Sequence, residues 1–347
     1  MKLLVVTQAL DLDDPLLSAY HDWVGALAHE AESIEAVCLK EGRHALPSNV
    51  TVHSLGKEKG ERSSIQYALS FLGLAWRLRG SYDSVFVHMN EEYVLIGGPV
   101  WKLLGKRVYM WRNHYDGSWL TDIAAFWCAN VFCTSKRSYT AKYTKTLFMP
   151  VGVNTERFSA VGNETRVAGS ILFFSRIAPS KRVELFIDAL ALLKEKGIAF
   201  TARIVGTAPP EFEEYAAMLA ERVASNGLSN CVTFAPGVPN PETPAIFRSS
   251  ELYVNCSPSG MLDKIIFEAA ASGCLVISES EDMSAFGFSD VTYESGSAVS
   301  LAEKIEYLLL VDESEKQTLR ARLLNLAQEN SLKGLAQKLT NHMNNPV

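Results

Sequence analysis

The chain of 347 residues is long enough for two hydrophobic cores, since 48% of its residues are hydrophobic. Its formal net charge of −6 argues against a general nucleic-acid binder, whose surface is normally basic. The six cysteines show no C-x-x-C spacing, so we expect buried thiols, not disulfides or zinc ligands. The apolar stretches are too short for a membrane span. We therefore expect a cytoplasmic protein that is at most peripheral to the inner face of a membrane.

Short runs rich in Val, Ile and Phe alternate with longer segments of helical period along the chain. The pattern begins with a predicted strand at residues 2–7, a helix at 18–29 and a strand at 35–38. Such β-α-β order predicts parallel sheets of an α/β fold. Further strands are predicted at residues 84–88, 107–111, 131–134 and 146–150 in a first series, and at 170–174, 202–205, 231–234, 252–255 and 275–278 in a second.

The two series are separated by a change in composition. Residues 149–158 read MPVGVNTERF, and a polar loop follows at residues 159–166. The sequence therefore predicts two doubly wound domains, at residues 1–150 and 151–330. A last helical stretch within residues 331–347 is predicted to pack back on the first domain.

An arginine and a lysine lie on the turn that follows the strand at residues 170–174. Arg176 and Lys181 are five positions apart, and a helix is predicted from residue 183. In open α/β sheets ligands lie beyond the carboxyl ends of the strands, where helix N-termini bind anions. A guanidinium grips two phosphate oxygens and an ammonium adds a point charge, so the pair suits a diphosphate. The alternative is that both are solvated loop cations.

A second candidate segment covers residues 255–273. A strand ends at Asn255, a turn rich in Ser, Pro and Gly follows, and a helix is predicted from Asp263 to about residue 271. Backbone N–H groups of the turn and the helix start can face an anion. Lys264 and Glu268 share a helix face, which also fits an ordinary helical salt bridge.

Taken together, these segments resemble the donor domain of family-four GT-B glycosyltransferases, the retaining transferases of group 1. The resemblance covers nearly all of residues 150–330 and is carried, in order, by residues 151–158, 174–181, 204–206, 232–238 and 267–273. It implies a GT-B fold, in which two Rossmann-like domains face an interdomain cleft. It also implies a retaining hexosyltransferase with no obligatory cofactor or metal, whose donor is a nucleoside-diphosphate sugar, UDP- or GDP-linked.

The resemblance assigns roles to individual positions. Arg176 and Lys181 bind the donor diphosphate, Glu268 holds the ribose, and the backbone near Val238 contacts the base. The candidate catalytic residues are His114, Arg176, Lys181 and Asp263. The other candidate donor-binding residues are Gly152, Gly206, Val238, Gly260, Met261, Leu262, Lys264 and Glu268.

The sequence departs from the family pattern at one position. Many members carry a first Glu eight residues before the second, and that position is Gly260 in this chain. We expect the backbone of residues 260–263 and the Asp263 side chain to contact the sugar and phosphate instead, assisted by Lys264. The departure affects the donor sugar and not the reaction class.

The first domain, implied to bind the acceptor, carries two histidines at the ends of predicted strands. His114 fits the position where the family places a histidine near the donor sugar, and it does so better than His88. A neutral imidazole there could hydrogen-bond the sugar or the acceptor; a structural histidine is the alternative at both positions. Asp11, Asp13 and Asp14 are candidates either for acceptor binding or for capping the next helix.

The first domain is also locally basic. Residues 102–145 contain eight Lys and Arg residues but only two acidic ones, Asp116 and Asp122. Polybasic surfaces with aromatic neighbours attract anionic lipid. Peripheral membrane contact is one interpretation, and a solvated charged face is the other. The residues concerned are Lys136, Arg137, Lys142 and Lys145, with Trp101, Tyr139 and Tyr143.

The sequence thus predicts a glycosyltransferase that moves a sugar from a nucleotide sugar to a saccharide or lipid-linked saccharide, in polysaccharide or glycolipid biosynthesis. The motifs offer no well-placed carboxylate nucleophile, which favours a front-face mechanism. Two alternatives use the same fold: a nucleotide-sugar binder without catalysis, and a sugar-nucleotide epimerase.

Overall fold

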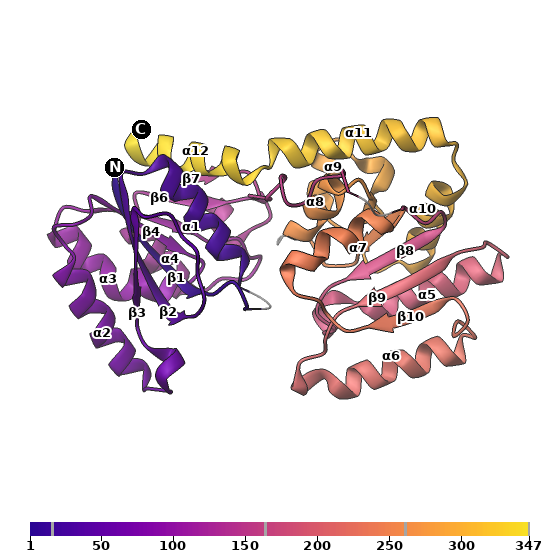
Figure 1. The fold of residues 1–347 in the computed structure, drawn as a ribbon, viewed down its shortest axis with the longest axis horizontal. Coiled ribbons are helices and arrows are strands. Elements are labelled where there is room, and N and C mark those ends of the chain that lie inside the picture. The colour runs from indigo at the N-terminus through magenta and orange to yellow at the C-terminus, as the bar shows by residue number, and fades with distance from the viewer. Residues whose placement is uncertain (15–16, 163–164, 260–261, 346–347) are drawn as a thin grey trace. The chain divides into compact units, whose positions relative to one another are not determined.

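The computed structural model describes residues 1–14, 17–162, 165–259 and 262–345. The chain divides into two compact units. Unit 1 comprises Met1–Gly152 and Leu332–Val347, and unit 2 comprises Val153–Ser331. Each unit contains one parallel β-sheet with helices packed on it (Figure 1). The expected pair of parallel α/β sheets is confirmed.

Unit 1 contains seven paired strands within the described residues, in the order β3-β2-β1-β4-β5-β6-β7. The strands are β1 (Lys2–Leu10), β2 (Ser33–Glu41), β3 (Val50–Ser54), β4 (Ser84–His88), β5 (Arg107–Trp111), β6 (Asn130–Cys133) and β7 (Thr146–Phe148). The helices are α1 (Ala19–Glu30), α2 (Ser64–Arg77), α3 (Glu91–Leu103), α4 (Trp119–Trp127) and α12 (Leu332–Asn344), with 3₁₀ turns η1 (Lys57–Lys59) and η2 (Tyr139–Lys142).

The β1 strand shows why its sequence is a continuous apolar run. Successive side chains of a strand point to opposite faces of the sheet. Leu3 and Val5 therefore enter one core, with α1 and α12, whereas Leu4 and Val6 enter the other, with α2, α3 and α4. Because helices cover both faces, all interior positions of the strand except Gln8 are buried.

Unit 2 contains a five-stranded parallel sheet within the described residues, in the order β10-β9-β8-β11-β12. The strands are β8 (Ser170–Phe174), β9 (Thr201–Val205), β10 (Val232–Ala235), β11 (Leu252–Asn255) and β12 (Leu275–Ser278). The helices are α5 (Val183–Glu195), α6 (Glu213–Ser225), α7 (Thr243–Ser249), α8 (Lys264–Ala271), α9 (Glu281–Ala285), α10 (Ala298–Leu310) and α11 (Glu313–Glu329), with 3₁₀ turns η3 (Pro179–Lys181), η4 (Pro210–Phe212), η5 (Asn240–Glu242) and η6 (Ser289–Val291).

The strand order creates a topological switch point in each sheet. In unit 2 the chain runs from β8 outward to β10, then returns to pair β11 with the other edge of β8. In unit 1 the same reversal occurs between β1 and β4. Loops at such a point leave in opposite directions beyond the carboxyl ends of the strands, where open α/β sheets bind ligands.

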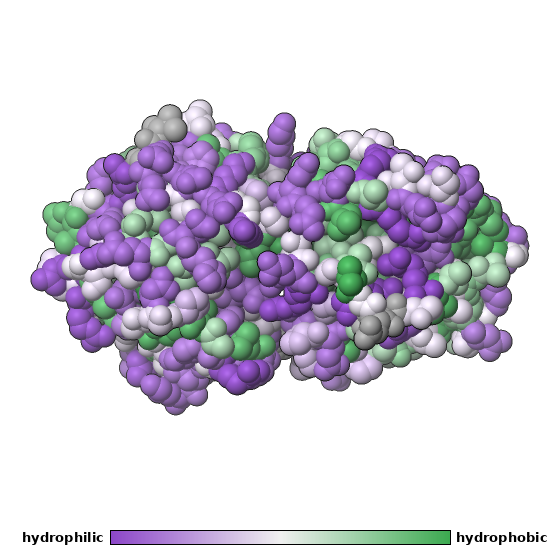
Figure 2. Space-filling view, turned by 45° about the horizontal axis from the view of Figure 1, so that its top comes forward, coloured by the Kyte–Doolittle hydropathy of each residue, from purple (hydrophilic) through white to green (hydrophobic). Residues whose placement is uncertain are grey.

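The polarity of the surface and the state of the cysteines follow the expectations from the composition. The face drawn in Figure 2 is mainly hydrophilic, with hydrophobic residues scattered over it. Five of the six cysteines are buried, and all six are free thiols. No helix among the described residues is both long and apolar enough to cross a membrane.

Two sequence-based expectations need correction. The sequence pattern did not predict the edge strand β3. This strand has only five residues, and their side chains are partly exposed, so it lacks the apolar run that marks the other strands. Trp101 is not an interfacial aromatic: it is fully buried in the core beneath α2 and α3, and its indole N–H donates to the Tyr82 hydroxyl. Trp101 therefore stabilises the fold and does not belong to the basic surface that the sequence predicted.

Gly152, a predicted donor-binding residue, occupies a packing position at the end of the first stretch of unit 1. Its φ is +82°, and a Cβ at this position would lie 2.5 Å from Leu335 Cδ2 and 3.1 Å from a ring carbon of Trp23. Leu335 belongs to α12 and Trp23 to α1. The glycine therefore lets the chain pass close to the contact between these helices.

We expect Gly152→Ala to lower the free energy of unfolding by about 2–3 kcal/mol, from overpacking and from the positive φ. Gly25→Ala is the matched control, because nothing lies within 4 Å of a Cβ there and the residue is in the α1 interior. The control should gain roughly 0.5–1 kcal/mol. Urea unfolding of both variants measures the difference, and equal stabilities would contradict the packing role.

Candidate functional site

The loops at the carboxyl ends of the unit 2 strands gather most of the predicted donor-binding residues. Ser175 and Arg176 follow β8, Gly206 follows β9, and the loop with Val238 follows β10. The segment from Cys256 to Asp263 follows β11 and leads into α8. All strands are parallel, so these loops share one edge of the sheet.

Gly206 brings the loops after β8 and β9 into direct contact. A Cβ on Gly206 would lie 1.8 Å from the Ser175 carbonyl oxygen, a distance that no side chain permits. The Ile177 N–H also donates to the Thr207 carbonyl at 3.2 Å. Gly206 therefore lets the backbone approach closely on both sides of Arg176, and its role as a donor-binding residue stays a prediction.

Lys181 bridges the loops on either side of the switch point. Its Nζ lies 2.7 Å from Asp263 Oδ2 and donates to Ser257 Oγ at 3.0 Å. The Asn255 amide donates to the same Asp263 oxygen at 3.2 Å. Lys181 follows β8, and its partners follow β11, which is the neighbouring strand. The contacts therefore tie the two loops together where a ligand is expected.

The protonation of Asp263 follows from these contacts. Burial by itself would raise the pKa of Asp263, but the Lys181 charge and the hydrogen bonds from Lys181, Ser257 and Asn255 outweigh it and lower the pKa. The carboxylate is therefore ionised at neutral pH. It offsets the charge of Lys181.

Arg176 differs from Lys181 in its surroundings. The residue is exposed, and within the described parts of the chain its guanidinium makes no hydrogen bond or ion pair. A guanidinium in this state can bind an anion without first losing a protein partner. Arg176 can therefore bind an anion at the carboxyl edge of the unit 2 sheet directly, whereas Lys181 is already paired with Asp263.

The start of α8 provides the next part of the site. Asp263 is the N-cap of the helix, and Leu262 before it is buried with φ of 43°. Lys264 Nζ lies 3.5 Å from Glu268 Oε1, so the expected i,i+4 pair is formed, and Glu268 is buried. The predicted residues Gly260 and Met261 lie outside the described residues.

A second ion pair near this edge was not predicted from the sequence. Arg182 adopts a left-handed backbone with φ of 51°, and its guanidinium donates to Glu279, which follows β12. Glu279 is buried and also accepts from the Ser295 hydroxyl at 2.6 Å. The position of Glu279 directly after an apolar strand was the only signal in the sequence.

In unit 1, His114 lies in the loop after β5. Its Nδ1 accepts a hydrogen bond from the Asp116 N–H at 2.9 Å, and its ring stacks on Tyr115. A neutral imidazole with Nδ1 as acceptor carries its proton on Nε2. The hydrogen bond to Nδ1 leaves Nε2 as the ring nitrogen that faces other partners.

The remaining candidates in unit 1 have structural contacts. His88 is buried among the rings of Tyr20, Trp23 and Trp111. Asp14 accepts a hydrogen bond from the Leu17 N–H at 2.9 Å, just before α1. The contact closes a turn ahead of the helix and does not cap it, because Ser18 is the N-cap of α1 and makes no side-chain capping hydrogen bond.

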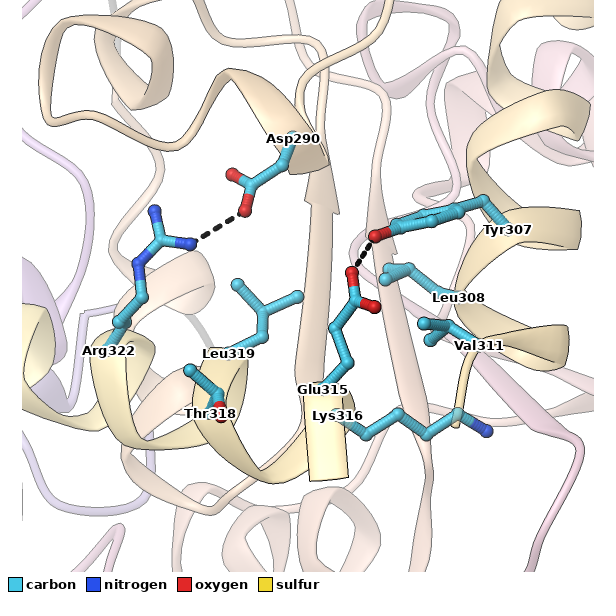
Figure 3. A pocket seen from close by; sticks show the side chains of 9 residues that line it. All are labelled: Asp290, Tyr307, Leu308, Val311, Glu315, Lys316, Thr318, Leu319 and Arg322. Atoms are coloured by element: carbon cyan, nitrogen blue, oxygen red, sulfur yellow. Dashed lines mark hydrogen bonds and ion pairs between the residues drawn. The ribbon is translucent and has the colours of Figure 1, made fainter. Parts of the chain in front are cut away.

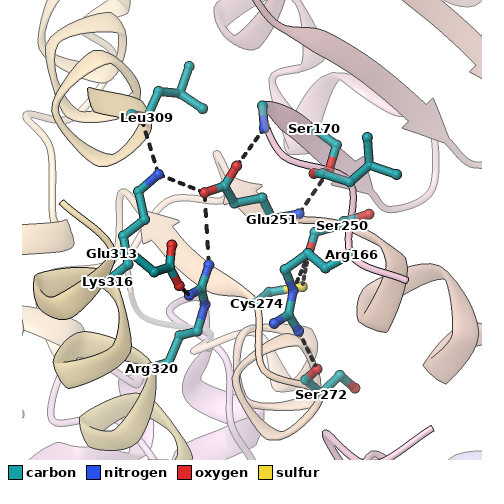
Figure 4. Close-up of polar contacts among 12 residues, drawn as sticks. Arg166, Ser170, Ser250, Glu251, Ser272, Cys274, Leu309, Glu313, Lys316 and Arg320 are labelled. Atoms are coloured by element: carbon teal, nitrogen blue, oxygen red, sulfur yellow. Dashed lines mark hydrogen bonds and ion pairs between the residues drawn. The ribbon is translucent and has the colours of Figure 1, made fainter. Parts of the chain in front are cut away.

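Two further features of unit 2 lie elsewhere. A cavity of about 70 Å³ is lined by α10, α11 and Asp290, and contains none of the loop residues described above (Figure 3). Buried Glu251, which precedes β11, pairs with Lys316 and Arg320 of α11 (Figure 4). This network fastens α11 to the sheet.

Among the described residues, no group of three or more His, Cys, Asp or Glu is placed to hold a metal ion.

Comparison with known proteins agrees with this arrangement. Residues 168–310 match the family described as Glycosyl transferases group 1. This region, which lies within unit 2, is therefore similar to group 1 glycosyltransferase domains. No curated protein matches the chain.

Solved structures share the fold of the whole chain. HepE from Anabaena in complex with UDP is 17% identical with a TM-score of 0.79, covering 99% of this chain and 100% of its own. The same protein with UDP-glucose has a TM-score of 0.71 at 16% identity, covering 99% and 98%. Sucrose-phosphate synthase from Thermosynechococcus elongatus is 14% identical with a TM-score of 0.77, covering 98% of each chain. The GT-B fold class is confirmed.

We expect the Lys181–Asp263 pair to give unit 2 a pH-dependent stability. Asp263 has a lowered pKa in the folded state, so its contribution is present above the unfolded pKa of about 4 and is lost as the pH falls. Asp263→Asn should lower the free energy of unfolding by roughly 1–3 kcal/mol at pH 7. The difference from the wild type should shrink below pH 4. A gap that is constant across this range, measured by urea unfolding at each pH, would contradict the ion pair.

Proposed function

We propose that this chain is a retaining transferase that moves a hexose from a UDP-sugar to a saccharide or lipid-linked saccharide, in polysaccharide or glycolipid biosynthesis. Unit 2 binds the donor and unit 1 the acceptor. The observation that carries the proposal is the edge of unit 2 where Lys181 bridges to Asp263 at the start of α8 and Arg176, unpaired among the described residues, follows the neighbouring strand β8. The UDP and UDP-glucose complexes of HepE support UDP as the nucleotide.

The donor-site residues act on the leaving diphosphate. As the bond from the sugar C1 to the phosphate oxygen breaks, negative charge grows on that oxygen. Arg176, Lys181 and the N–H groups at the start of α8 stabilise this charge. Glu268, buried one turn into the helix, accepts hydrogen bonds from the ribose hydroxyls. The lysine is held in place by Asp263 before the donor binds.

Retention follows from attack on the face that the phosphate leaves. The acceptor oxygen bonds to C1 on that face, and its proton passes to the departing phosphate oxygen, so no enzyme carboxylate is consumed. Asp263 is unsuited as a nucleophile, because one of its oxygens already accepts from both Lys181 and Asn255. We therefore assign Asp263 to positioning Lys181. His114 Nε2–H is assigned to a hydroxyl of the sugar or acceptor.

Arg176→Ala should lower kcat/KM for transfer by about 100-fold or more, because the loss is comparable to removing an oxyanion donor. Lys181→Ala should act in the same direction. Arg203→Ala is the matched control: Arg203 is an exposed arginine in the middle of β9, away from the carboxyl edge. Sugar release from UDP-glucose with and without acceptors measures the effect. Wild-type turnover in both edge variants would refute the assignment.

The nucleotide is tested by thermal unfolding with a panel of UDP-, GDP- and ADP-sugars. A donor at one hundred times its Kd adds about 2.7 kcal/mol to the stability of the folded state. We expect UDP-sugars to raise Tm and the others to leave it unchanged at equal concentration. A larger rise in Tm with GDP-sugars than with UDP-sugars would identify guanine as the base. An unchanged Tm with every nucleotide sugar would contradict the proposed donor site.

A further inference from the structure

Arg182 turns the chain from the loop after β8 into α5, directly after Lys181. Its φ of 51° lies in the left-handed region, where residues other than glycine are strained. It is the N-cap of α5, yet its side chain makes no capping hydrogen bond to that fully described helix. The conformation of the turn that presents Lys181 therefore depends on a contact that the Arg182 side chain makes elsewhere.

Glu279, in the loop after β12, provides this contact. The Arg182 guanidinium donates through Nη1 to Glu279 Oε1, and the carboxylate is buried, with 1% of its side chain exposed. The same Oε1 accepts from the Ser295 hydroxyl at 2.6 Å, and Oε2 accepts from the Gly296 N–H at 3.5 Å. Both carboxylate oxygens are thus held by donors from the chain after β12. The carboxylate is a fixed partner for the guanidinium.

A second set of contacts connects Glu279 to the partners of Lys181. The Glu279 N–H donates to the Asn255 carbonyl at 3.2 Å. The Tyr293 hydroxyl lies 3.4 Å from that carbonyl and 3.4 Å from Glu279 Oε2. The Asn255 side chain in turn donates to Asp263, which accepts from Lys181. Glu279 is therefore linked to the lysine through two neighbouring loops, the one after β8 and the one after β11.

We propose that Glu279 is a positioning residue for nucleoside-diphosphate binding, acting through Arg182 on Lys181. The inference rests on the proposed function, in which Lys181 binds the donor diphosphate. A carboxylate repels a diphosphate, so Glu279 serves the donor site by geometry and not by its charge. It holds the left-handed turn, and the turn sets the direction of the Lys181 ammonium.

Glu279→Gln tests the role by the direction of its effect on UDP binding. The substitution keeps the size of the side chain and removes an anion, so by charge alone it would strengthen the binding of UDP. We expect it instead to weaken UDP binding by about tenfold, because a carboxamide presents N–H groups where Gly296 or Arg182 already donates. Calorimetric titration of the full chain with UDP measures the Kd.

Arg182→Gly removes the guanidinium and relieves the strain of the left-handed turn at the same time. We expect it to weaken UDP binding by about as much as Glu279→Gln, and the double variant to be no weaker than either single one. Arg182→Lys should retain most of the affinity, because an ammonium can also donate to Glu279. Neutralising two opposite charges would then shift the affinity in the same direction, as a shared positioning role requires.

Lys181→Ala separates positioning of the lysine from a general effect on unit 2. It should weaken UDP binding at least as much as Glu279→Gln does. In the Lys181→Ala chain, adding Glu279→Gln should change the Kd by less than about twofold, because the side chain that it positions is absent. A residue that only stabilises the unit would weaken UDP binding equally in both backgrounds.

The matched control is Asp188→Asn. Asp188 lies within α5, the helix that Arg182 precedes, and accepts two hydrogen bonds from Arg222 of α6, at 2.6 and 2.7 Å. Its substitution breaks an ion pair of the same helix away from the carboxyl edge, and the affinity for UDP should stay that of the wild type. The Tm of every variant without UDP shows that it folds.

Three results would overturn the positioning role. Tighter UDP binding by Glu279→Gln would mean that Glu279 withholds Arg182 from the ligand, and an equal loss in both Lys181 backgrounds would indicate a structural role. Wild-type affinity in Glu279→Gln, with weakened binding in Lys181→Ala, would overturn this inference alone. Wild-type affinity in Lys181→Ala, or no UDP binding by the wild type, would contradict the proposed donor site and this inference with it.

Discussion

The contact of Lys181 with Asp263 and Ser257 determines where the candidate donor site can be. It links the loops after β8 and β11, which the strand order sends in opposite directions. An ammonium and a carboxylate that are both largely shielded from water need good hydrogen bonding to offset their desolvation, and Asn255 adds a further donor. These hydrogen bonds therefore hold the Lys181 and Asp263 side chains in place at the carboxyl edge of the unit 2 sheet. In the proposed function, a diphosphate competes with Asp263 for Lys181, whereas the guanidinium of Arg176 has no partner among the described residues to displace.

Backbone conformation points to the same regions. Met89, Arg182 and Leu262 are the non-glycine residues with positive φ in the described part of the chain. Met89 follows β4 at the switch point of unit 1, and the other two precede α5 and α8 on either side of the switch point of unit 2. Such conformations cost about 1–3 kcal/mol each and persist only where the surroundings hold them. The strain is thus concentrated in loops next to the two switch points.

The sequence predicts what depends on local burial. Strands such as β1 and β8 are covered on both faces, so they read as apolar runs, whereas the half-exposed β3 does not. Arg176 and Lys181 could be singled out because position at a strand end follows from strand prediction. The Arg182–Glu279 pair could not, since it joins residues 97 positions apart through a left-handed turn.

Side-chain exposure was the least predictable property, as the tryptophans of unit 1 illustrate. Trp101 and Trp119 lie on neighbouring helices, yet the first is buried and the second is exposed. The difference depends on which helix face meets the sheet, and α4 meets it through alanines.

The α4 core contacts are therefore complete without Trp119 or Phe126, so folding does not require either ring. Two large aromatic side chains in water gain nothing for the folded chain, because they are about as exposed as in an unfolded one.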